Sequence, residues 1–88
     1  MLNLSQTTRF KRELKQMQRR NVDFSALKFV IETLLQEKPL PQKYRDHELT
    51  GNWRKFRECH IQPDWLLIYK IDAGTLMLYR TGTHSDLF

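Results

Sequence analysis

Apolar side chains recur at helical spacing in the first quarter of the chain. Phe10, Leu14 and Met17 occupy positions i, i+4 and i+7, which places them on one face of a helix. Charged and polar residues fill the positions between them. The pattern predicts a helix over residues 8–20, with Asn21 as its stop.

A second amphipathic segment follows. Its apolar stripe at i, i+3, i+4, i+7 and i+8 consists of Leu27, Val30, Ile31, Leu34 and Leu35. Asp23 or Ser25 can cap the free amides of its first turn. Pro39 is expected to end the helix, because proline disfavours helical backbone in the residue before it.

The second half of the chain has a strand pattern. Residues 53–61 alternate imperfectly between apolar and polar, and residues 65–71 are almost continuously apolar, as in a central strand buried on both faces. Asp72-Ala73-Gly74 predicts a hairpin turn, and residues 75–80 form the returning strand. A short strand near residues 2–4 is also expected.

Residues 40–50 are expected to form a polar loop, and residues 81–88 a tail. Two helices followed by three antiparallel strands predict one α+β domain over residues 1–88, with both helices on one face of a small antiparallel sheet. The other face would then be an open, concave surface for a partner.

The charge of the chain is unevenly distributed. Its formal net charge is +5, and residues 1–45 hold ten lysines and arginines against four aspartates and glutamates. Residues 46–88 hold five against six. The basic half suits a polyanionic partner, either nucleic acid or an acidic protein.

Cys59 is the only cysteine, so an internal disulfide is excluded. No apolar run approaches the roughly 20 residues of a membrane span, and the N-terminal residues lack a secretory pattern. These features favour the cytoplasm and argue against a membrane partner. Neither paired cysteines nor helical histidine pairs occur at zinc spacing, so no metal or other cofactor is expected.

The candidate chemistry is concentrated in the second half, which contains all three histidines, His47, His60 and His84. Each has a carboxylate within two residues, and Asp64 follows His60 closely. Imidazole can take and return a proton near neutral pH, as metal-free RNA cleavage by general acid and base requires. Arg80 can offset the charge that develops on the phosphoryl oxygens.

Several motifs carry a more specific signal when they are read in order. They are Asp46-His47-Glu48-Leu49, Gly51-Asn52-Trp53, Arg57-Glu58-Cys59-His60-Ile61, Pro63-Asp64-Trp65-Leu66-Leu67-Ile68-Tyr69-Lys70 and Arg80-Thr81-Gly82-Thr83-His84. Together they resemble the YafQ branch of the RelE/ParE toxin superfamily over nearly the whole chain. The resemblance implies a toxin of a type II toxin–antitoxin system, with the RelE-like fold.

This resemblance implies a ribosome-dependent endoribonuclease, an mRNA interferase. It would cut mRNA in the ribosomal A site without a metal, leave a 2′,3′-cyclic phosphate and so inhibit translation. Its partners would be mRNA on the ribosome, with contacts to 16S rRNA, and a cognate antitoxin in a hetero-oligomer. The residues that match the family's site are His47, His60, Asp64, Arg80 and His84 as catalytic groups, and Phe88 and Trp65 as substrate-binding groups.

The residues leave some roles open. His84 is expected to be the main proton-transfer group and is favoured as the acid, whereas Asp64, His47 or His60 is the base or orients it. Phe88 or Trp65 would stack on a base of the codon. Two alternatives on the same scaffold are a ParE-like gyrase inhibitor and a non-catalytic module that binds RNA or protein.

Overall fold

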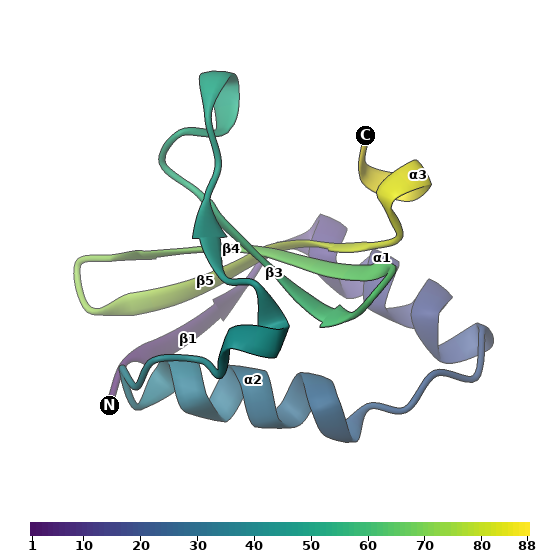
Figure 1. The fold of residues 1–88 in the computed structure, drawn as a ribbon, viewed down its shortest axis with the longest axis horizontal. Helices are drawn as coiled ribbons and strands as arrows, with labels where there is room; N and C mark the ends of the chain where they lie inside the picture. Colours follow the sequence, from purple (N-terminus) through teal and green to yellow (C-terminus); the bar gives the residue numbers. More distant parts are fainter.

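The computed structural model describes residues 1–88 and contains one five-stranded sheet with helices packed on it (Figure 1). The strands are β1 (Asn3–Gln6), β2 (His47–Glu48), β3 (Arg57–Gln62), β4 (Trp65–Asp72) and β5 (Thr75–Gly82). Their order across the sheet is β1-β5-β4-β3-β2. The predicted α+β class is confirmed.

The sheet is mixed, because one edge strand runs parallel to its neighbour. β3, β4 and β5 pair in antiparallel fashion, as the sequence predicts, and β2 adds a further antiparallel strand beside β3. β1 lies parallel to β5, and Asn3 is opposite Thr75. A parallel neighbour requires a long crossover connection, and here the two helices and three other strands lie between β1 and β5 in the chain.

The first helix, α1 (Thr8–Arg19), matches its prediction closely. The Thr7 side chain caps it by accepting a hydrogen bond of 2.9 Å from the Phe10 amide. Asn21 adopts a left-handed φ of 61° and ends the segment, as expected. None of the helices has the length and apolar character needed to cross a bilayer.

The second helix, α2 (Ser25–Leu35), begins where the Asp23 carboxylate accepts a bond from the Ser25 amide. It ends at Leu35, four residues before Pro39. The prediction that Pro39 ends this helix is therefore wrong. Glu37 takes a left-handed φ of 57°, and its amide donates to the Leu34 carbonyl. This turn reverses the chain before the proline is reached.

The main core lies between the sheet and the two long helices, which Figure 1 shows below and behind the strands. Its buried side chains come from α1, α2, β3, β4, β5 and the 3₁₀ turn η1 (Gln42–Tyr44). The predicted apolar run of β4 is buried on both faces, and residues 65–69 are all buried. Residues Ala73 and Gly74, both with positive φ, turn β4 into β5, as expected.

The opposite sheet face is not open over its whole area, in contrast to the prediction. Leu66 and Ile68 of β4 are fully buried there. They pack with Leu87 and with the partly buried residues Leu49, Trp53, Phe56 and Tyr79. Burial of these apolar side chains favours folding the segment 49–56 onto the sheet.

Two predicted irregular segments contain short elements. The expected loop 40–50 includes η1 and β2, and residues Gly51–Trp53 form a second 3₁₀ turn, η2, instead of starting a strand. The expected tail contains a short helix, α3 (His84–Leu87). Thr83 and Asp86 form a capping box around it, with each side chain accepting a bond from the other's amide.

Candidate active site

The pairing register brings two of the three histidines onto one sheet face. His47 of β2 is opposite Glu58 of β3, and His60 is opposite Leu66 of β4. Residues opposite each other in antiparallel strands share a face, and Glu58 and His60 are two apart on the same strand. His47, Glu58 and His60 therefore lie in a row on the face opposite the long helices.

Glu58 connects this row. Its carboxylate oxygen Oε1 lies 3.6 Å from Nε2 of His47 and 3.7 Å from Nε2 of His60. The other ring nitrogens face carbonyl groups, with His47 Nδ1 2.6 Å from the Arg45 oxygen and His60 Nδ1 3.4 Å from the Pro63 oxygen. Because a carbonyl can only accept, Nδ1 carries the proton in both rings and Nε2 faces the carboxylate.

Glu58 is not among the site residues that the sequence predicts. Its side chain is only 9% exposed, which is unusual for a glutamate. The signal in the sequence was its position two residues before His60 in a predicted strand. That spacing places both side chains on one face, but the partner histidine on β2 is visible only from the sheet register.

His84 reaches the same face from α3. Its Nδ1 lies 2.8 Å from Oδ1 of Asp64, and its backbone amide donates to the same oxygen at 3.1 Å. These bonds hold the pKa of Asp64 below its usual value. A carboxylate only accepts, so Nδ1 of His84 carries the proton and Nε2 is left for another group.

The rings of His60 and His84 are 5.7 Å apart, centre to centre. Two imidazoles at this separation can contact opposite sides of one small group, such as a phosphate. Glu58 and Asp64 supply a negative charge beside each of them. The arrangement can thus move one proton to a substrate and another away from it.

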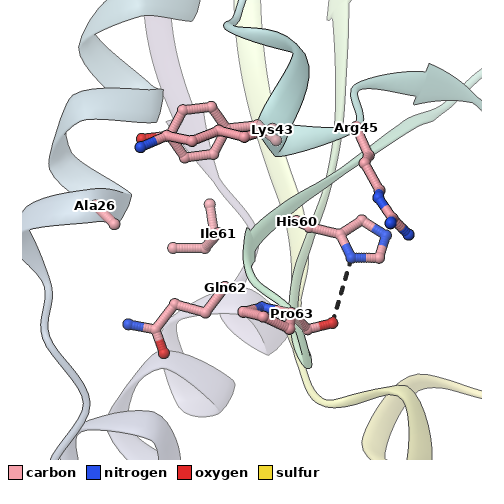
Figure 2. A pocket seen from close by; sticks show the side chains of 8 residues that line it. Ala26, Lys43, Arg45, His60, Ile61, Gln62 and Pro63 are labelled. Atoms are coloured by element: carbon pink, nitrogen blue, oxygen red, sulfur yellow. Dashed lines mark hydrogen bonds between the residues drawn. The ribbon is translucent and has the colours of Figure 1, made fainter.

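A hollow of about 440 Å³ opens beside His60. Its walls come from η1, the N-terminal end of α2, the end of β3 and the turn after it. The lining residues are Ala26, Lys43, Tyr44, Arg45, His60, Ile61, Gln62 and Pro63. Figure 2 shows the Arg45 side chain pointing toward the His60 ring, and the hydrogen bond from that ring to Pro63.

Arg80 is held away from open solvent. Its Nη2 lies 2.6 Å and its Nε 3.2 Å from Oε2 of Glu13 on α1, and the Arg80 side chain is only 8% exposed. Nη2 also reaches the backbone oxygen of Asp86 at 3.5 Å. The structure brings Arg80 to the base of α3, with its guanidinium bound to a carboxylate of the protein itself.

Trp65 is placed in the main core, so its predicted role in stacking on a base is wrong. It is 2% exposed and packs edge-on against Phe24 at 5.5 Å. Its indole N–H donates to Thr81 Oγ1 at 2.8 Å. No face of the ring is available to a substrate. Phe88, by contrast, follows α3 and is 63% exposed, so its role in substrate binding stays a prediction.

Other candidate chemistry is not supported. No group of three or more histidine, cysteine, aspartate or glutamate side chains has an arrangement that could hold a metal ion. Cys59 is fully buried, and desolvation raises the pKa of its thiol far above the usual value. A buried, protonated thiol is a poor nucleophile.

The chain is similar to known proteins over nearly its whole length. A family model described as a bacterial toxin of type II toxin–antitoxin systems, YafQ, matches residues 2–88. The mRNA interferase toxin YafQ of Escherichia coli strain K12 is 41% identical over 80 residues, which span 90% of this chain and 87% of that protein.

Solved structures are similar over the full chain. A copper-bound variant of a toxin from Helicobacter pylori superposes with a TM-score of 0.97 at 41% identity, and the match covers all of both chains. In the DinJ–YafQ complex from E. coli, the matched chain gives a TM-score of 0.92 at 37% identity, covering 100% of this chain and 99% of that one.

Proposed function

Because the chain belongs to the YafQ family of toxins from type II toxin–antitoxin systems, we propose that it is an mRNA interferase whose acid and base are histidines. The observation that supports this most directly is the His60–His84 pair, 5.7 Å apart and flanked by Glu58 and Asp64. The proposed substrate is mRNA in the A site of the ribosome.

In the proposed reaction His60 takes the proton of the ribose 2′-hydroxyl at Nε2, and Glu58 stabilises the resulting imidazolium. The 2′-oxygen forms a bond to phosphorus and the bond from phosphorus to the 5′-oxygen breaks. Protonated His84 donates its Nε2 proton to that leaving oxygen, while Asp64 holds Nδ1. The products are a 2′,3′-cyclic phosphate and a 5′-hydroxyl end, and no metal takes part.

The basic surface of α1 is the proposed contact for 16S rRNA. Its exposed cations include Arg9, Lys11, Arg12 and Arg19. Neutralising phosphates with such side chains releases counterions, so affinity for the ribosome should fall steeply with salt. We propose the cytoplasm as the location because the ribosomes that the toxin would enter are there.

A cognate antitoxin is the second proposed partner. The E. coli relative was solved as the DinJ–YafQ complex, and this chain matches its YafQ fold over the full length. Binding of an antitoxin would form a toxin–antitoxin hetero-oligomer.

The test is primer extension on mRNA from cells that express the chain or its His84→Ala variant. Loss of an acid or base typically slows a reaction by about 10²–10⁴-fold, so cleavage should disappear on the assay's timescale. Gln36→Ala, an exposed change at the end of α2, is the matched control and should cleave normally.

Full cleavage by a folded His84→Ala protein would contradict the proposal. The two alternative functions give different results in parallel assays. A gyrase inhibitor would block DNA supercoiling by purified gyrase, and a non-catalytic module would bind RNA without cutting it.

A further inference from the structure

Cleavage of a phosphodiester places extra negative charge on the phosphoryl oxygens, which a nearby cation stabilises. Arg80 is poorly placed for this task, because Glu13 already binds two of its guanidinium nitrogens and burial shields the rest. The site therefore needs a cation from elsewhere.

Other arginines near the histidine row are also occupied. Arg57 lies 3.2 Å from Asp46 and 3.5 Å from Glu48, and Arg20 lies 2.7 Å from Asp86. The remaining cations beside His60 are Lys43 and Arg45, which line the hollow. Both are exposed, and neither forms an ion pair.

Arg45 is the better placed of the two. Lys43 lies over the Tyr44 ring at 5.2 Å, whereas the Arg45 side chain points toward the His60 ring in Figure 2, and Arg45 and His60 both line the hollow. The Arg45 backbone has a left-handed φ of 50°, and its carbonyl accepts the 2.6 Å bond from His47. This uncommon backbone conformation therefore places the Arg45 carbonyl where it orients the His47 ring.

We propose that the hollow beside His60 binds one nucleotide of the RNA substrate and that Arg45 pairs with the scissile phosphate. The inference rests on the proposed function and assigns the phosphate-binding role to Arg45 instead of Arg80. A volume of about 440 Å³ lies within the range of small-ligand sites. The Gln62 amide in its wall offers a donor and an acceptor to a base edge.

The experiment measures single-turnover cleavage of mRNA bound to programmed ribosomes, by purified wild type, Arg45→Met, Arg45→Lys and Arg54→Met. Arg54 is an exposed arginine at the end of η2, outside the hollow, and serves as the matched control. Each protein is also tested on mRNA with a single Rp or Sp phosphorothioate at the cleaved position, because a direct contact to one oxygen discriminates between the two isomers.

Arg45→Met should cleave about 10- to 100-fold more slowly and lose the preference for one isomer. Arg45→Lys should recover part of the rate, since a lysine restores the charge without the paired donors. Arg54→Met should keep the isomer preference. Thermal unfolding should be unchanged, because the Arg45 side chain is exposed and bonds to no other group.

Wild-type rate and isomer preference in Arg45→Met would overturn this inference and leave the proposed function intact. A loss of folded protein in that variant would also overturn it, because Arg45 would then be a structural residue. If the proposed function is wrong, the result is different: wild type and His84→Ala then show the same mRNA cleavage.

Discussion

Helix α3 is too short to persist alone, so its attachment should control how His84 is presented. Isolated helices need about 12–15 residues to be even marginally stable, and α3 has four. The Asp86 carboxylate holds it in two ways. It accepts the Thr83 amide at 2.9 Å, and it binds Nη1 of Arg20 at 2.7 Å and Nη2 at 3.3 Å.

We predict that Asp86→Ala opens α3 without unfolding the sheet. Loss of one capping side chain costs about 0.5–2 kcal/mol, typically about 1. A free-energy loss of 1–2 kcal/mol changes a closed-to-open ratio by about 5- to 30-fold. The lost contact with Arg20 also favours the open state. The increase in the open population of α3 should therefore lie towards the upper end of this range.

The assay is native-state hydrogen exchange by NMR at the amides of Leu87 and Phe88. These amides donate to the carbonyls of Thr83 and His84, and they exchange only when α3 opens. Ser85→Ala is the matched control, because Ser85 is exposed on the same helix and its side chain makes no hydrogen bond. Unchanged exchange at both amides in folded Asp86→Ala would refute the assigned role of Asp86.

Two further predictions test the groups around the site. Glu13→Gln breaks the largely buried ion pair with Arg80, so the free energy of unfolding should fall by about 3–5 kcal/mol. Urea denaturation measures this change, and a loss below about 1 kcal/mol would contradict the prediction. The lowered pKa of Asp64 means that its contact with His84 stabilises the fold above about pH 3.9, the ordinary aspartate pKa, and is lost as the pH falls through the lowered value. NMR titration of the Asp64 carboxyl carbon should therefore give a midpoint below the ordinary aspartate value, and a midpoint at or above that value would contradict the prediction.

Local patterns in the sequence predicted the helices and the hairpin well. The stripes of α1 and α2 and the positive-φ turn at Ala73 and Gly74 depend on residues only a few positions apart. The parallel pairing of β1 with β5 depends on contacts between distant parts of the chain, which periodicity does not encode. Helix α3 was missed because its signal is the single pair Thr83 and Asp86.

The site could be predicted only in part, because residue types are visible in the sequence whereas contacts between distant residues are not. Residue types that can transfer protons identified the histidines, and the structure gathers all three on one face. The ion pair between Arg80 and Glu13 could not be predicted, because the two residues lie 67 positions apart in the chain. Trp65 was misassigned because a continuous apolar run does not show which side chains stay accessible.

The position of β5 between β1 and β4 has a consequence for the order in which the protein forms. During synthesis the N-terminal strand emerges first, but residues 3–6 have no strand to pair with until residues 75–78 have been made. Such distant pairing is slow, because closing the long loop costs chain entropy before the strand contacts can stabilise the fold. His84 lies beyond that last strand, so the histidines proposed to transfer protons come together only after β5 has been made.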